Sequence, residues 1–135
     1  MEIDFPCALE HLTEIRAFAT KELAMHPLTA RERAMLIGAV DELCANIIIH
    51  GNSLDVRKRI HIFIGRKGNA MHINTCDSGL AFDQTNRLSK PISELIEAKA
   101  RGGLGLVIIS KAADSFNYER RNGQNYFSII KNLAV

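Results

Sequence analysis

The sequence is poor in cysteine, and neither sign of charge predominates. Its three cysteines, Cys7, Cys44 and Cys76, are odd in number and widely spaced, which argues against a disulfide framework and against a zinc site built on paired cysteines. The formal net charge is only +2, so there is no strongly basic surface of the kind that binds nucleic acid tightly. We therefore expect no nucleic-acid partner.

Long apolar runs are also absent. The notable run at residues 47–49, like the others in the chain, falls far short of the roughly 18 residues that a membrane helix needs. The first ten residues, MEIDFPCALE, carry acids where a secretory signal carries basic residues, and they include no apolar signal core. We expect a soluble, cytoplasmic protein without a membrane segment.

The chain lacks internal repeats, low-complexity stretches and domain linkers. Of its 135 residues, 47% are hydrophobic and 24% are charged, which is the composition of one globular domain with a substantial core. We expect residues 1–135 to form a single domain.

The first half of the chain has mainly helical periodicity. Residues 3–5 alternate like a short edge strand, and apolar residues recur at helical spacing over 9–25. Thr29 and Glu32 match a capping box, which predicts a second helix that runs to His50. Gly51 is then expected in the left-handed conformation after the helix end.

The second half of the chain has the alternation of strands. Residues 59–65 and 70–77 predict one hairpin, and residues 116–121 and 124–131 predict another, closed by a type I′ turn at Asn122-Gly123. Between the hairpins we expect a long polar segment with a short helix at 92–99, and then a buried helix over 103–114. So long a polar segment in a small domain is usually a functional lid or disordered.

Glu42, Asn46 and His50 follow one line along the second predicted helix, opposite its apolar stripe. Such a line is most often a solvated helix face. Here the neighbouring positions include Ala45 and Ile49, and polar groups among apolar neighbours need partners. Magnesium is a suitable partner, because it prefers oxygen ligands and takes few of them from the protein.

Asp77 and Gly79 stand at the end of a predicted strand. Alternation places Asp77 on the same face as Met71 and Ile73, where a carboxylate is costly unless it accepts strong hydrogen bonds. An adenine amino group is a suitable donor, and a glycine allows a flat base to approach the backbone closely. The alternative is an ordinary Asp-Ser-Gly turn.

The run Arg101-Gly102-Gly103-Leu104-Gly105 opens the third predicted helix. A glycine-rich helix start presents free N–H groups and the positive end of the helix dipole, which suits a phosphate group. The run is neither a dinucleotide fingerprint nor a GxxxxGK[ST] phosphate loop. The alternative is a flexible hinge.

Taken together, these three motifs resemble those of the GHKL ATP-binding superfamily, which has the Bergerat fold. Glu42-x-x-x-Asn46 is similar to its N-box, Asp77-x-Gly79 to its G1 box and Gly103-x-Gly105 to its G2 box. The resemblance implies an α+β two-layer sandwich, in which helices cover one face of a mixed or antiparallel sheet. The order would be β-α-α-β-β-lid-α-β-β, with an ATP lid at about 83–102.

Within this superfamily the chain most resembles the serine-protein kinases that act as anti-sigma factors. The run Cys44–Gly51 and the sequence DSGLAFD over 77–83 are similar to variants typical of that group. The resemblance implies ATP and Mg²⁺ as cofactors and an anti-sigma-factor antagonist of the STAS type as the phosphorylated partner. It further implies a sigma factor as a second partner, and a homodimer.

The same resemblance implies the roles of individual residues. Glu42 would be the general base and Asn46 the Mg²⁺ ligand, while Asp77, with Gly79 beside it, would accept from the adenine amino group. His50 would line the phosphate end of the site or cap the helix.

The remaining roles fall at the glycine-rich run and in the last hairpin. Gly103, Leu104 and Gly105 would hold the phosphates, and Arg101 would offset charge on the transferring group. In the last hairpin, Asn125 stands close to the position of a threonine in the wider family.

Two other functions stay open from the sequence. A non-catalytic module could bind ATP and switch protein partners without transferring the phosphoryl group. Alternatively, the domain could have lost nucleotide binding and serve only to dock another protein.

Overall fold

A computed structural model describes residues 1–52, 55–80 and 106–133. It contains a five-stranded sheet with the order β1-β2-β3-β5-β4, in which every pair of neighbours is antiparallel. The strands are β1 (Glu2–Pro6), β2 (Arg59–Lys67), β3 (Ala70–Asp77), β4 (Ser115–Arg121) and β5 (Gln124–Asn132). Both predicted hairpins are confirmed, and so is the predicted first strand, which pairs with β2 at one edge.

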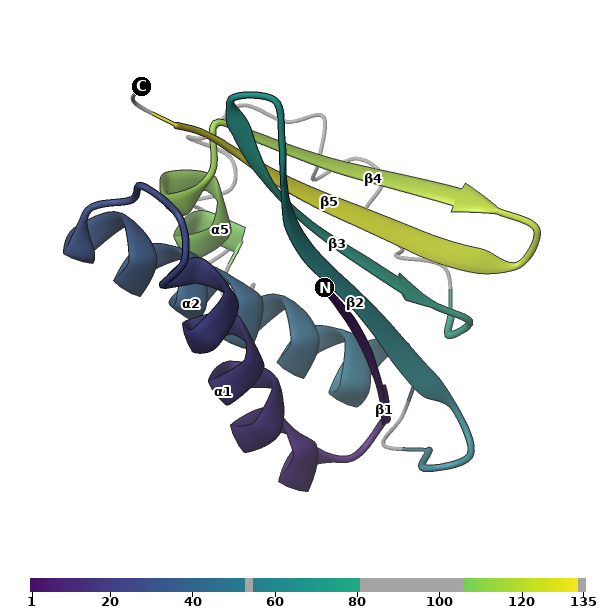
Figure 1. The fold of residues 1–135 in the computed structure, drawn as a ribbon. Helices are drawn as coiled ribbons and strands as arrows, with labels where there is room; N and C mark the ends of the chain where they lie inside the picture. The colour runs from purple at the N-terminus through teal and green to yellow at the C-terminus, as the bar shows by residue number, and fades with distance from the viewer. Residues whose placement is uncertain (53–54, 81–105, 134–135) are drawn as a thin grey trace.

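The helices form a second layer on one face of this sheet (Figure 1). They are α1 (Leu12–Leu23), preceded by a 3₁₀ turn at Leu9–His11, then α2 (Ala30–Asn46) and α5 (Leu106–Ala112). The predicted two-layer α+β architecture is therefore confirmed. The lid, the short helix predicted at 92–99 and the start of the third helix fall outside the described residues.

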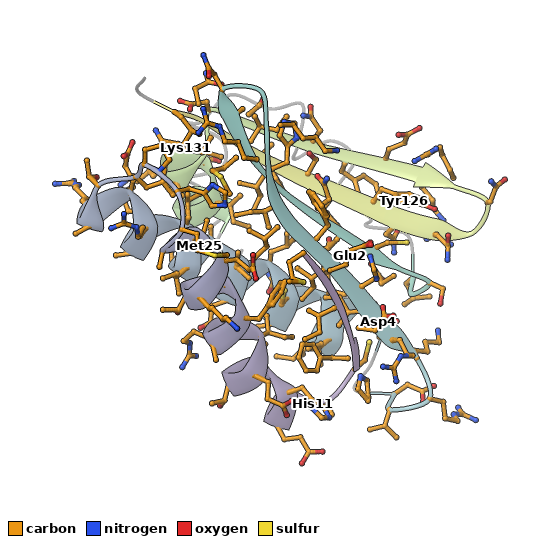
Figure 2. The ribbon with its side chains drawn as sticks, viewed as in Figure 1. Glu2, Asp4, His11, Met25, Tyr126 and Lys131 are labelled. Atoms are coloured by element: carbon orange, nitrogen blue, oxygen red, sulfur yellow. The ribbon has the colours of Figure 1, made fainter. Side chains whose placement is uncertain are left out.

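The capping box at the start of α2 is confirmed. The Thr29 hydroxyl accepts from the Glu32 backbone N–H at 3.0 Å, and the Glu32 carboxylate accepts from the Thr29 backbone N–H at 2.8 Å. Lys131 reaches from β5 to the helical layer (Figure 2), with its Nζ 3.6 Å from a carboxylate oxygen of Glu32. These contacts fix the beginning of α2 against one end of the sheet.

The core lies between the two layers. Alternate residues of the strands point into it, and the apolar stripe predicted on the second helix meets them. The fully buried members include Leu36, Val40, Ile60, Ile62, Ile64, Met71, Ile73 and Ile129. A single apolar core of this kind holds the two layers in a fixed relation.

The two hairpin turns use residues with positive φ. Asn122 and Gly123 have φ values of 52° and 75°, which is the geometry of the predicted type I′ turn. In the first hairpin Gly68 has φ of 60°, at the predicted turn between β2 and β3. Because these turns fix the register, they also fix which residues meet across the strands.

The end of the second helix differs from the prediction. The α-helical hydrogen bonding stops at Asn46, and a π-helical turn follows over Ile47–Gly51. Gly51 thus belongs to this turn and does not stand beyond the helix as a left-handed cap. π-Helical turns are rare and occur often at functional sites.

Candidate functional site

Asp77 is the last residue of β3, and it points into the protein. As the alternation predicted, it shares the inner face with Met71, Ile73 and Thr75, and only 3% of its surface is exposed. The carboxylate therefore lies at the end of the apolar layer, where an ionised group needs hydrogen-bond donors.

One carboxylate oxygen of Asp77 is surrounded by such donors. Asn52 Nδ2 donates to Oδ2 at 3.0 Å, the Gly79 backbone N–H at 2.9 Å, and Asn125 Nδ2 at 3.2 Å. These donors come from three separate segments of the chain. They hold the carboxylate in one orientation.

The other oxygen, Asp77 Oδ1, is buried and has no hydrogen-bond partner among the described residues. Asn52 Oδ1 and Thr75 Oγ1 are in the same situation. A buried polar atom without a partner costs about 1–3 kcal/mol, so three of them in one region indicate a missing ligand or ordered water. Asp77 Oδ1 and Asn52 Oδ1 can only accept hydrogen bonds, whereas the Thr75 hydroxyl can also donate one. This combination of acceptors and a donor suits a purine base that carries an amine.

Asn52 is a site residue that the sequence analysis missed. It is 2% exposed, and its Nδ2 donates to Ile47 O at 2.9 Å as well as to Asp77. It follows the π-helical turn and satisfies a carbonyl at the start of that turn. Asn52 was missed because a stretch of Gly, Asn and Ser is typical of a surface loop. Its burial depends on contacts with β3, which is distant in sequence.

Asn125 also lies at this site, directly across from Asp77 in the register of β3 and β5. Its residue is 2% exposed, and its amide bonds to Asp77 and to Leu80 O, the latter at 2.8 Å. Tyr118 and Arg120 of β4 contact the amide oxygen, and neither was predicted as a site residue. Alternation along 116–121 places both on the inner face, which is the one signal that could have found them.

Glu42 and Asn46 lie on α2, and both are half-buried. Within the described part of the chain, neither side chain has a hydrogen-bond or ion-pair partner. Asn46 directly precedes Ile47, whose carbonyl accepts from Asn52, so the end of α2 is tied to Asp77. Glu42 precedes Asn46 by about one helical turn, which is a rise of roughly 6 Å along α2. The roles of Glu42 and Asn46 toward phosphate and metal stay predictions.

The electrostatic field of Asp77 reaches two buried thiols. Burial raises the pKa of Cys7 to about 11, and the Asp77 carboxylate adds to the effect. Burial likewise raises the pKa of Cys44 on α2, with contributions from the carboxylates of Asp41 and Asp77. Both thiols therefore stay protonated at neutral pH.

Several predicted site residues fall outside the described residues. They are Arg101, Gly103, Leu104 and Gly105, together with the side chain of His50. Among the residues that are described, no three His, Cys, Asp or Glu side chains gather into a metal-binding cluster. In the same part of the chain, no helix is long and apolar enough to cross a membrane.

A family model for the histidine kinase-like ATPase domain matches residues 5–131. The chain belongs to this family, which confirms the resemblance inferred from the three motifs.

Two similar proteins are named as kinases. The serine/threonine-protein kinase BtrW of Bordetella bronchiseptica is 27% identical over 106 residues, which are 78% of this chain and 75% of that protein. The serine-protein kinase RsbW of Bacillus cereus is 34% identical over 89 residues, which are 63% of this chain and 55% of the relative. The match thus spans little more than half of the Bacillus protein.

Two solved structures share the fold. One is the crystal structure of the RsbU and RsbW domains of a Mycobacterium tuberculosis protein, with a TM-score of 0.69 and 15% identity over 98% of this chain and 31% of that one. The other is the SiaB–SiaC complex of Pseudomonas aeruginosa, with a TM-score of 0.66 and 14% identity over 97% of this chain and 88% of that one.

Proposed function

We propose that this histidine kinase-like ATPase domain binds ATP with Mg²⁺ and transfers the γ-phosphoryl group to a serine or threonine of a partner protein. The observation that carries the proposal is the buried, unpartnered Oδ1 of Asp77, with Thr75 Oγ1 and Asn52 Oδ1 in the same region. The names of the similar kinases support the direction of transfer, from nucleotide to protein.

Base binding is assigned to the end of β3. Asp77 Oδ1 accepts from the exocyclic amine of adenine, while Oδ2 stays with its three protein donors. Because the carboxylate is buried, the hydrogen bond to the amine forms away from competing water. Thr75 Oγ1 can donate to a ring nitrogen, directly or through a water molecule.

Phosphate chemistry is assigned to α2 and to the glycine-rich run. Asn46 offers an uncharged amide oxygen for Mg²⁺, which when bound neutralises charge on the phosphates. Gly103, Leu104 and Gly105 hold phosphate oxygens through the backbone, and Arg101 offsets charge on the group in transfer. The resemblance assigns His50 either to this end of the site or to the cap of the helix.

Glu42 acts as the general base. The partner's hydroxyl oxygen forms a bond to the γ-phosphorus as the bond to the β–γ bridging oxygen breaks, and ADP leaves. The hydroxyl proton passes to the Glu42 carboxylate. The half-buried position of Glu42, without a competing partner among the described residues, supports this role.

The proposed protein substrate is an anti-sigma-factor antagonist of the STAS type, and a sigma factor is the second proposed partner. Both come from the resemblance to anti-sigma-factor kinases, as does a homodimer. Light scattering measures the assembly directly. A homodimer gives twice the 15.0 kDa of one chain.

The test is phosphoryl transfer from γ-labelled ATP to a purified STAS-domain protein. Wild type and Glu42→Gln are compared, with the exposed Glu119→Gln as the matched control. We expect Glu42→Gln to bind ATP normally but to lose transfer, and Glu119→Gln to behave as wild type. Equal transfer by Glu42→Gln would contradict the assignment of the base. ATP binding by the wild type without transfer to any hydroxyl would favour the non-catalytic partner-switching module.

A further inference from the structure

The side-chain amide of Asn125 forms hydrogen bonds both to the end of β3 and to the neighbouring strand β4 of the last hairpin. Its Nδ2 donates to Leu80 O at 2.8 Å and to Asp77 Oδ2 at 3.2 Å, and it lies 3.4 Å from Gly79 O. All three neighbours on this side are acceptors. The amide nitrogen, with two hydrogens, is therefore the group required here.

The amide oxygen of Asn125 faces the opposite kind of neighbour. It accepts from Tyr118 Oη at 2.6 Å and from Arg120 Nη1 at 2.8 Å. A flipped amide would direct its nitrogen at the guanidinium of Arg120 and its oxygen at the carboxylate of Asp77. Tyr118 and Arg120 thus select the orientation in which Asn125 donates to Asp77.

Arg120 contributes a second bond to the same region. Its Nη1 donates to Gly79 O at 3.1 Å, which joins β4 to the turn that follows β3. Its positive charge also polarises the Asn125 amide in the sense that strengthens donation to the Asp77 carboxylate. The guanidinium and the carboxylate stand at the two ends of one hydrogen-bonded chain.

We propose that Arg120 and Tyr118 are positioning residues for base recognition, acting through Asn125 to hold Asp77 with one oxygen free for the exocyclic amine. They thereby set the preference of the site for adenine over a purine that lacks this amine. The proposal rests on the proposed function, because it assumes that the base binds at Asp77. In this proposal both residues act through Asn125 and not by contact with the nucleotide.

The test compares Arg120→Met and Tyr118→Phe with the matched control Arg121→Met. Arg121 is the next residue of the same strand, but it pairs with Glu119 and stacks 4.4 Å from the Tyr126 ring centroid. Calorimetry measures the dissociation constants of ATP and of purine riboside triphosphate, which has hydrogen in place of the amine. Melting temperatures show that each variant is folded.

We expect the wild type and Arg121→Met to prefer ATP by roughly tenfold or more, because a free acceptor paired with an amine gains a charge-assisted hydrogen bond. Arg120→Met and Tyr118→Phe should lose about three- to tenfold in ATP affinity, with a much smaller loss for the analogue. Arg120→Lys, which keeps a donor and a positive charge, should restore part of the preference.

The outcomes separate the two proposals. A wild-type protein that binds neither nucleotide overturns both the proposed function and this inference. A wild type that prefers ATP, with an unchanged preference in both Arg120→Met and Tyr118→Phe, overturns the positioning role alone. An equal loss for the two nucleotides would also overturn it, since that result indicates general damage to the site.

Discussion

The side-chain amide of Asn52 donates a 3.0 Å hydrogen bond to the carboxylate of Asp77, joining the end of the π-helical turn to the end of β3. The same nitrogen donates to Ile47 O at 2.9 Å. One buried side chain thus ties the helix that carries Asn46 to the strand that carries Asp77, the proposed base-binding residue. The proposed metal and base sites are parts of one connected unit.

Asn52→Ala should therefore affect both stability and nucleotide binding. Its removal leaves Ile47 O without the side-chain donor and takes one of three donors from Asp77, at a cost of about 1–3 kcal/mol in the free energy of unfolding. Urea titration measures this loss, and calorimetry should show weaker ATP binding. Asn117→Ala, at an exposed position on β4, serves as the control. Equal midpoints for the two variants would contradict the role of Asn52.

The capping box makes a prediction that concerns only the fold. Thr29→Ala removes the hydroxyl that accepts from the Glu32 backbone N–H at the start of α2. A lost cap of this kind typically costs about 1 kcal/mol, which lowers the urea midpoint. Thr13→Ala, at an exposed position within α1, should be neutral or slightly stabilising, because alanine is the better helix former. A Thr29→Ala protein as stable as Thr13→Ala would show that the cap contributes nothing.

We expect the stability of the protein to depend on pH through His61. Its ring nitrogens lie 2.8 Å from Asp4 Oδ1 and 2.9 Å from Glu2 Oε1, two acids on β1 (Figure 2). Burial lowers the pKa of His61, but the hydrogen bonds to Asp4 and Glu2 outweigh it and raise the pKa above the ordinary 6.5. The stabilisation is therefore fully present below pH 6.5 and is lost as pH rises through the folded-state pKa. Its size stays below about 1 kcal/mol, because the side chains are exposed.

Thermal melts at pH 6 and pH 8.5 test this prediction on wild type and His61→Gln. The wild type should exceed the variant in melting temperature at the lower pH, and the difference should shrink at the higher pH. His72→Gln is the control with the opposite sign, since burial and then Lys67 lower the pKa of His72, so that protonating it destabilises the fold. A difference for His61→Gln that grows with pH would contradict the pairing with β1.

Much of the fold could be predicted because it depends on local pattern. The alternation over 59–65 and 70–77, the Asn122-Gly123 turn and the Thr29 capping box each determine structure within a few residues. The π-helical turn could not be predicted, because its stabilisation comes from the bond between Asn52 and Ile47 O and from the buried neighbours of Asn52.

The site was predictable to the extent that its residues lie on regular elements. Alternation along β3 was enough to predict that Asp77 points inward. The helical period was enough to predict that Glu42 and Asn46 lie on the same face of α2. Asn52, Tyr118 and Arg120 join the site through contacts between distant segments, as in the bond from Arg120 to Gly79 O. Alternation along 116–121 places Tyr118 and Arg120 on the inner face, but no pattern within one segment shows which distant atoms they contact.

Binding of ATP by wild type and Asp77→Asn, measured by calorimetry, tests the central claim most directly. In the variant, the amide oxygen should take the place of Oδ2 among the donors from Asn52, Gly79 and Asn125. The amide nitrogen then stands where the free acceptor stood and faces the adenine amine as a second donor. We predict that Asp77→Asn melts cooperatively but has lost ATP binding by a factor of at least about 100, as expected when a buried charge-assisted bond is replaced by two opposed donors. ATP affinity equal to that of the wild type would contradict the assignment of Asp77 as the base-binding residue.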